Sequence, residues 1–477
     1  MHREWRMTSS ATDYNSPMKL ARVAFVLLAA CGHDLPGAPD ASSMDSSVVV
    51  DDAPLDDARL DEVVDAAQLD PTTCTVGATD GCCPVAVAYG GSDPDCASLN
   101  CTFALSTPIP LDDDWRDVEL GGVGMAWTGS ELVLAWNSSR PSPTSPLHPI
   151  STITYERRDP TGALTFGPVT NDDRKIGANT TRTAPELGFE PTSGTILFAS
   201  SAPDFRYAET LDANGVPSSA ARSLGVDCDP ITSRLQIYPW QGQFLVAQGE
   251  DPCGPVVHRA RVDRLSVTGT FLGAAIGEQS VHSVGMTWDP TNNRIVFSGG
   301  SPLSERVFVP PSMFHAPTML RESNTRATAI SAGAGTYLVT FDHRYSTGDE
   351  IRSDPWAGTW NIDHLSSAPN TDAYMLPSAP DRKTVAARLV WTGSGWLQLQ
   401  SSFVGLGGET PNSYAAFSTK AWRFASDGSV AESFDLDPTW PTYLVNAIWA
   451  GDRMAITYVS MQGGLERRFL RYASCAP

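Results

Sequence analysis

One short phrase occurs twice in this chain and predicts how most of it folds. Gly124–Ser130 leads into Leu132–Trp136, and Arg388–Ser394 leads into Trp396–Gln400. Each copy joins two short apolar stretches through a tight Thr-Gly-Ser turn, which is the pattern of a β-hairpin. The repeat therefore indicates an all-β fold built from recurring hairpins.

Five weaker copies of this hairpin accompany the two clear ones. Their second runs start 43–63 residues apart along the chain. A third, alternating run follows in most units, and several units continue through a Gly-containing turn into a fourth. The first runs are expected at Met125–Trp127, Glu186–Phe189, Leu235–Tyr238, Gly285–Trp288, Ala327–Ile330, Leu389–Trp391 and Asn446–Trp449. The second runs are expected at Leu132–Trp136, Thr195–Ala199, Phe244–Ala247, Arg294–Phe297, Tyr337–Phe341, Trp396–Leu399 and Met454–Val459.

Four antiparallel strands per unit, with no helix between units, are typical of β-propeller blades. The seven units predict seven blades over residues 103–477, and the irregular fourth and fifth units leave six or eight blades as alternatives. The last unit ends after Arg468–Tyr472 without a fourth strand. Phe103–Leu111 is expected to supply it, because such a closure removes an open sheet edge. That pairing would bring Cys101 beside Cys475.

The N-terminal part of the chain contains an export signal. Lys19 and Arg22 precede the apolar run Val23–Ala30, which is too short to span a bilayer. The sequence Leu28-Ala29-Ala30-Cys31 that ends this run resembles the lipobox of bacterial lipoproteins at all four positions. The resemblance implies cleavage before Cys31 and acylation of that residue, so the chain would be exported and held at a membrane by its acyl chains.

The residues on either side of Cys31 refine this prediction. Residues 1–30 are assigned to the signal peptide, with Met18 as the expected start of translation. Gly32, rather than Asp, follows the cysteine, which favours the outer membrane of a Gram-negative-type envelope. Residues 31–71 are expected to be a disordered, lipid-anchored linker, because residues 34–70 hold eleven acidic side chains, one Arg and no aromatic residue.

The nine cysteines suit an oxidising compartment. Residues 72–102 are predicted to form a small disulfide module, in which four cysteines pair among themselves; these are Cys74, Cys82, Cys83 and Cys96. Two further bonds are predicted from blade geometry, Cys101–Cys475 and Cys228–Cys253. The second would join two connections on one face of the third unit.

No motif in the chain specifies a reaction. The formal net charge of −21 argues against nucleic acid as a partner. No metal site, cofactor or catalytic residue is predicted. The densest group of acids, bases and anion-binding side chains lies in an expected loop, Asp342–Ser353. The candidate binding residues are Asp342, His343, Arg344, Tyr345, Asp349 and Glu350.

These observations predict a monomeric, non-catalytic surface lipoprotein of the cell envelope. Its propeller would be a binding or scaffold module for a protein or glycan ligand, since rigid blades position variable loops. The alternative is an extracytoplasmic hydrolase or lyase that acts on polysaccharide. A carboxylate pair or a His cluster at the channel mouth would favour the enzyme.

Overall fold

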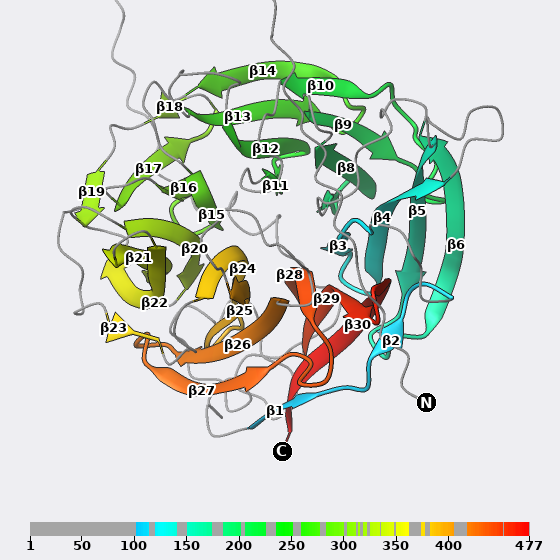
Figure 1. Ribbon diagram of the computed structural model, residues 1–477. Coiled ribbons are helices and arrows are strands. Elements are labelled where there is room, and N and C mark those ends of the chain that lie inside the picture. The colour runs from blue at the N-terminus through cyan, green and yellow to red at the C-terminus, as the bar shows by residue number, and fades with distance from the viewer. Residues whose placement is uncertain are drawn as a thin grey trace, which may run out of the picture. The chain divides into compact units, whose positions relative to one another are not determined.

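Seven antiparallel sheets surround a central channel (Figure 1). All of the described residues belong to one compact unit, Val64–Pro477, and they contain no helix, so none that could cross a membrane. The computed structural model describes residues 102–113, 120–140, 150–173, 185–201, 206–225, 235–250, 259–276, 283–299, 303–311, 313–314, 318–321, 325–333, 335–347, 350–361, 374–376, 382–404, 417–451 and 453–476.

Each sheet is one blade of a seven-bladed β-propeller, as the sequence predicted. Blade 1 contains β3 (Val123–Trp127), β4 (Leu132–Arg140), β5 (Ile150–Arg158) and β6 (Leu164–Asp173). Blade 2 contains β7 (Glu186–Glu190), β8 (Thr195–Ser201), β9 (Arg206–Leu211) and β10 (Arg222–Gly225). Blade 3 contains β11 (Leu235–Trp240), β12 (Gln243–Glu250), β13 (Arg259–Ser266) and β14 (Phe271–Ile276). Blade 4 contains β15 (Ser283–Asp289), β16 (Arg294–Gly299), β17 (Leu303–Val309), β18 (Met313–Phe314) and β19 (Thr318–Arg321).

The remaining blades follow in chain order. Blade 5 contains β20 (Thr325–Gly333), β21 (Thr336–Thr347), β22 (Glu350–Asn361) and β23 (Tyr374–Met375). Blade 6 contains β24 (Arg382–Trp391), β25 (Gly395–Val404), β26 (Phe417–Ala425) and β27 (Val430–Asp435). Blade 7 contains β28 (Thr442–Ala450), β29 (Arg453–Gln462), β30 (Leu465–Ala476), β1 (Thr102–Leu105) and β2 (Ile109–Pro110).

Burial explains why the inner hairpins are readable from sequence. The second strand of each blade is covered on both faces by neighbouring blades, so β29 is buried at seven successive positions from Met454 to Ser460. Outer strands such as β14 and β27 instead alternate between half-buried and exposed residues. A strand that is buried on both faces reads as a continuous apolar run, and a half-buried strand reads as an alternating one.

Apolar clusters between neighbouring blades close the ring. Within the described residues, each of the seven interfaces has its own cluster. Trp127 belongs to the cluster between blades 7 and 1, and Trp391 to the cluster between blades 5 and 6. The twice-written phrase is therefore a packing element: its tryptophan covers the preceding blade.

The N-terminal strand completes the last blade. β1 pairs antiparallel with β30, and Phe103 lies opposite Cys475 in the register. β2 pairs further along the same strand, with Ile109 opposite Leu470. The predicted closure is confirmed, and the outer edge of β30 is covered by a segment from the other end of the chain.

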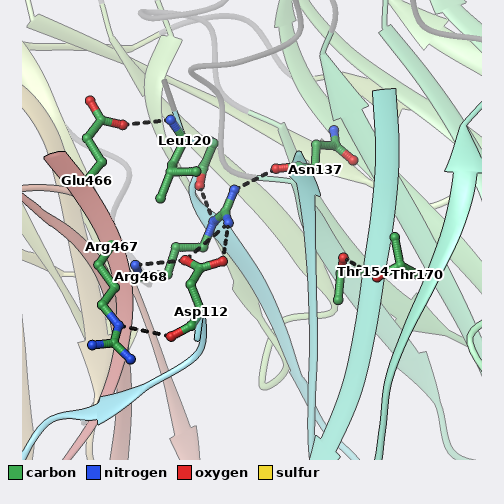
Figure 2. Close-up of polar contacts among 9 residues, drawn as sticks. Asp112, Leu120, Asn137, Thr154, Thr170, Glu466, Arg467 and Arg468 are labelled. Atoms are coloured by element: carbon green, nitrogen blue, oxygen red, sulfur yellow. Dashed lines mark hydrogen bonds and ion pairs between the residues drawn. The ribbon is translucent and has the colours of Figure 1, made fainter. Parts of the chain in front are cut away.

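A buried arginine fixes this closure (Figure 2). Arg468 is fully buried on β30, and its Nη1 lies 3.0 Å from Oδ1 of Asp112, which follows β2. Its Nε donates to the Gly121 carbonyl oxygen at 2.8 Å and its Nη2 to the Asn137 carbonyl oxygen at 2.7 Å. The guanidinium therefore ties together blade 7, blade 1 and the segments between β2 and β3.

Among the described residues, the turn between the third and fourth strands contacts the preceding blade in blades 1, 2, 3 and 6. In blade 2 this turn is Asp212–Gly215, where Asp212 Oδ1 accepts from the backbone nitrogens of Asn214 (2.8 Å) and Val216 (2.9 Å). Gly215 has a φ of 72°, and a Cβ built on it would overlap the ring of Tyr155 in blade 1. Only glycine meets both requirements, which explains the Gly at the end of this turn.

The structure corrects one prediction about secondary structure. Asp342–Ser353 is not a loop: β21 and β22 form a hairpin whose continuous register runs from Thr336↔Asn361 to Thr347↔Glu350. A run of charged residues favours a loop, but in the described residues 342–347 and 350–353 the backbone ladder continues. Tyr345 and Thr347 suit a strand, so polarity alone was a poor guide here.

Candidate functional site

The central channel holds a cavity of about 390 Å³. All seven blades line it through their first strands, each of which pairs with a neighbour on one side only and so turns its other edge to the channel. The described lining residues are Met125, Glu186, Leu187, Gln236, Ile237, Tyr238, Gly285, Met286, Thr287, Trp288, Pro290, Ala329, Ile330, Ser331, Ala332, Ala387, Arg388, Leu389, Val390, Trp391, Asn446, Ala447, Ile448 and Trp449. We call this space the channel cavity.

An ion pair crosses the channel cavity. Arg388 in β24 of blade 6 binds the carboxylate of Glu186 at the start of β7 in blade 2, and each side chain is 13% exposed. Blades 2 and 6 are not neighbours in the ring, so the pair joins opposite parts of the wall. Charges in a partly buried pair neutralise each other and hold both side chains in place.

Gln236 in blade 3 extends this bridge. With the amide oriented to satisfy its neighbours, its nitrogen donates to the Met286 carbonyl oxygen at 2.8 Å and contacts the Tyr238 hydroxyl, while its oxygen accepts from Arg388 Nη1 at 3.2 Å. The three linked side chains Glu186, Arg388 and Gln236 therefore come from blades 2, 6 and 3. We call them the crossbar.

The crossbar lies deeper than a set of aromatic residues. Depth can be measured from the last paired residue of each first strand, next to the turn. Glu186 and Gln236 lie four residues before that position in their strands, and Arg388 lies three residues before it. Trp288, Trp391 and Trp449 lie at or one residue before the last pair, next to the turns into the second strands. The face that carries these turns, here called the turn face, therefore has an aromatic channel mouth with the crossbar as its floor.

Neighbouring blades hold the aromatic side chains of the mouth. Trp391 lies 4.6 Å from Trp396, centroid to centroid, in an edge arrangement, and it packs on Gly333 of blade 5. Tyr238 stacks on Trp288 at 6.2 Å. Tyr238 and the three mouth tryptophans remain only half-buried. The mouth thus presents preorganised aromatic surface to solvent.

The described wall is mostly apolar and aromatic, with few ionisable side chains. Its ionisable side chains are Glu186, Tyr238 and Arg388. Burial raises the pKa of the Tyr238 phenol, and the Glu186 carboxylate raises it further, so this group stays protonated at ordinary pH. The described residues hold no group of three His, Cys, Asp or Glu side chains that could bind a metal ion.

The predicted binding residues lie elsewhere. Asp342 is buried on β21, and none of the six candidates is among the described residues that line the channel cavity. His343, Arg344 and Tyr345 follow it on β21, Glu350 begins β22, and Asp349 lies outside the described residues. Their role in binding stays a prediction. The strands place them at the end of blade 5 opposite the turn face.

The covalent predictions also stay open. Cys31, Cys74, Cys82, Cys83, Cys96, Cys101, Cys228 and Cys253 lie outside the described residues, and Cys475 is described only as a strand position. The linker and the disulfide module lie outside them as well.

Sequence analysis missed the crossbar. Arg388 opens one copy of the repeated phrase, and Glu186 opens the first strand of another unit, yet both were read only as parts of strands. The available signal was a charged residue in each of two strands expected to border the channel. The ion pair between them could not be predicted from the sequence, because 202 positions separate the two residues along the chain.

Comparisons with known proteins assign neither a family nor a function to the chain. No family model matches the chain, and none of the curated proteins matches it either. The WD40 domain of Toxoplasma gondii coronin is similar at 8% identity and a TM-score of 0.46, over 79% of this chain and 87% of that one. The polysaccharide lyase Uly1 is similar at 10% identity and a TM-score of 0.45, over 74% and 89%. The seven-blade assignment rests on the strand pairing of this chain itself.

Proposed function

We propose that this chain is an exported, lipid-anchored binding protein of the cell envelope whose propeller holds a protein ligand at its channel mouth. The acyl anchor and the linker would place the propeller near a membrane, and the turn face would meet the ligand. The proposal covers the whole chain, and the propeller carries the binding.

The observation that carries the proposal is the composition of the channel mouth. Trp288, Trp391, Trp449 and Tyr238 are half-buried around a cavity that Met286 also lines. Trp, Tyr, Met and Arg are the side chains enriched at protein–protein interfaces, and Trp, Tyr and Arg dominate their binding energy. A cavity of about 390 Å³ is large enough to admit an apolar side chain of a ligand.

The rigidity of the mouth supports the same proposal. Each mouth residue sits on a first strand that is paired with a buried second strand and packed against a neighbouring blade. Because these side chains are already ordered, a ligand would lose little of its binding energy to ordering them. The crossbar supplies a fixed polar floor, so the depth of the cavity is set before a ligand arrives.

Selection from a displayed library of random peptides on the immobilised chain tests the binding site. We expect the selected peptides to share an apolar or aromatic anchor. Their affinity should fall at least about tenfold in Trp288→Ala and in Trp449→Ala. Trp440→Ala, which changes a tryptophan outside the channel cavity, is the matched control and should bind like the unmodified chain. Thermal unfolding of each variant checks that it is folded.

Two results would contradict the proposal. Peptides that bind the channel variants and the unmodified chain equally well would place the site elsewhere. Cleavage of a polysaccharide by the chain, abolished in Glu186→Gln, would favour the alternative of a hydrolase or lyase.

The anchor has a separate test. Cys31→Ser should move the chain from the membrane fraction to the soluble fraction, because the acylated side chain is lost. A Cys31→Ser chain that stays tightly in the membrane fraction would refute lipid anchoring and would leave the binding proposal untouched.

A further inference from the structure

A second cavity, of about 380 Å³, opens between blades 5 and 6. Its walls come from β25, β26 and β27 of blade 6, from Pro355 in β22 of blade 5, and from the connection that leads to blade 7. The lining residues that the argument uses are Ser402, Lys420, Asp435, Asp437 and Trp440. We call this space the interblade pocket.

The strand register places its polar side chains on one face of blade 6. Lys420 lies directly opposite Asp435, and Ser402 opposite Ser418. Residues directly opposite each other in an antiparallel pair share a sheet face. Gln398 is on the same face, and its Nε2 donates to Thr340 Oγ1 in blade 5 at 3.1 Å. This face of blade 6 is therefore the one that looks toward blade 5.

The corresponding polar regions at two other interfaces are filled by the protein itself. Between blades 7 and 1, Arg468 takes up the space and pairs with Asp112. Between blades 2 and 3, Arg206 donates to Gln248 at 3.1 Å, and Gln248 donates to Asp263 at 2.8 Å. Blades 5 and 6 instead leave an open pocket at their interface.

Several polar groups of the interblade pocket have no partner in the described protein. Ser402 is 8% exposed and lines the pocket, yet its hydroxyl makes no hydrogen bond to any described residue. Lys420 and Asp435 face each other without forming an ion pair within the described residues. Because Ser402 lines the pocket, its hydroxyl can donate to and accept from a ligand bound there.

Trp440 gives the pocket an aromatic wall. It is 37% exposed, and among the described tryptophans it alone is exposed. Its backbone nitrogen and that of Thr439 donate to Asp437 Oδ1, at 3.3 Å and 2.9 Å. The same connection is tied to blade 7 where Met461 N donates to the Pro441 carbonyl oxygen at 3.0 Å. The exposed indole is thus held on an anchored turn.

We propose that the interblade pocket binds a pyranose unit of a neutral saccharide. Sugar hydroxyls both donate and accept, which matches a pocket that offers carboxylates, an ammonium group and a serine hydroxyl side by side. The flat, apolar face of a pyranose ring fits against an exposed indole. One lysine and two aspartates leave the pocket with a net negative charge, which disfavours an anionic sugar.

This inference is independent of the proposed channel function. The interblade pocket lies at the ends of β25 and β27 that point away from the turn face, and no residue lines both cavities. A saccharide bound here would be a second ligand class for the propeller.

The test uses a panel of neutral tetrasaccharides with the full chain. The panel contains β-1,4-linked glucose, α-1,4-linked glucose, β-1,4-linked mannose and β-1,4-linked N-acetylglucosamine. A tetrasaccharide that contains glucuronate is measured beside it as the anionic comparison. Binding is measured by saturation-transfer NMR and by calorimetry. We expect at least one member to bind, and its affinity to fall at least about tenfold in Trp440→Ala and in Asp435→Asn. Trp288→Ala at the channel mouth is the matched control and should leave saccharide affinity unchanged.

Three outcomes would overturn the inference. The first is that no neutral saccharide binds, and the second is that binding is unaffected by Trp440→Ala and Asp435→Asn. The third is binding confined to a tetrasaccharide that contains glucuronate. Because Trp440 is exposed and Asp435 lies at a strand end, both variants should fold, and their thermal unfolding is compared with that of the unmodified chain. Loss of peptide binding in Trp288→Ala with saccharide binding intact would separate the two sites.

Discussion

Arg388 in blade 6 and Glu186 in blade 2 form an ion pair across the channel cavity, each 13% exposed. The first strands of a propeller are edge strands, so nothing in the sheets themselves prevents water or a ligand from entering between them. This pair and Gln236 close the deeper part of the cavity and leave the aromatic mouth open. The same contact therefore links the stability of the ring to the shape of its binding surface.

Removing one partner of this pair should destabilise the fold. Arg388→Met leaves the Glu186 carboxylate partly buried without its counter-charge, which should lower the free energy of unfolding by about 2 kcal/mol. The double variant Arg388→Met/Glu186→Gln should recover part of that loss, because no unpaired charge remains. Urea denaturation of the single and double variants gives the coupling energy. Additive effects of the two substitutions would show that the contact is not a coupled pair in solution.

Asp112 should matter far more than its neighbour Asp113. Arg468 is fully buried, and Asp112→Ala would leave its guanidinium without a counter-charge. We expect this to lower the free energy of unfolding by about 3–5 kcal/mol. Asp113 is exposed and offers Arg467 only its backbone oxygen, so Asp113→Ala is the matched control and should change stability by less than about 0.5 kcal/mol. Equal unfolding free energies for the two variants would contradict the role given to Arg468.

The blades were predictable because of how a propeller buries its strands. Thr195–Ala199 and Met454–Val459 read as apolar runs because the neighbouring blades cover both of their faces, and the structure has a second strand at each place. The unclear third strands of units four and five are β17 and β22. β22 contains Asp354 and Pro355, and such residues obscure the strand pattern although the backbone ladder continues.

The candidate site was much less predictable. A channel wall takes one or a few residues from each blade, so its members are scattered along the sequence and carry no local spacing. Glu186 and Arg388 became a pair only when the ring closed. Asp342, which has charged neighbours along the chain, is buried on β21. The charged residues that are dense along the sequence lie at the end of the β21–β22 hairpin. The channel cavity and the interblade pocket depend instead on which blades lie next to or across from each other in the ring.

Two glycines with similar backbone conformations should differ sharply in their tolerance of alanine. Gly215 (φ 72°) would place a Cβ in the ring of Tyr155, whereas Gly194 (φ 69°) has no heavy atom within 4 Å of its added Cβ. Both substitutions strain the backbone by about 1–2 kcal/mol. Gly215→Ala should cost a further 1–3 kcal/mol, roughly, because the turn must move off blade 1. Equal melting temperatures would mean that this turn does not dock on blade 1.

Acid should weaken the turn between β26 and β27. The Ser429 hydroxyl and then its backbone nitrogen, at 2.7 Å and 2.9 Å from Asp427 Oδ1, hold the pKa of that carboxyl below its ordinary 3.8. Because the folded-state pKa is the lower one, the ionised group stabilises the fold above the unfolded pKa, and this contribution is lost as the pH falls through the folded pKa.

Asp427→Asn should therefore lower the free energy of unfolding at pH 7 and have a smaller effect near pH 2. Urea denaturation at both pH values measures the difference. Ser429→Ala is the control for the cause, since it should raise the pKa of Asp427 in an NMR titration. An unchanged pKa in Ser429→Ala would remove the basis of this prediction.

The closure of blade 7 should depend on Cys475. Phe103 lies opposite Cys475 in the β1–β30 register, and Cys101 precedes Phe103 by two residues. If the predicted Cys101–Cys475 bond forms, Cys475→Ala should free one thiol for alkylation and lower the melting temperature, since a long closed loop is worth on the order of 4 kcal/mol. Ser474→Ala, at the adjacent position of β30, is the control. It should free no thiol and should leave the melting temperature unchanged. Mass spectrometry after alkylation under denaturing, non-reducing conditions counts the free thiols. A count that falls by one in Cys475→Ala would mean that Cys475 was itself a free thiol, and blade 7 would then be closed by hydrogen bonds between β1 and β30 without the covalent link.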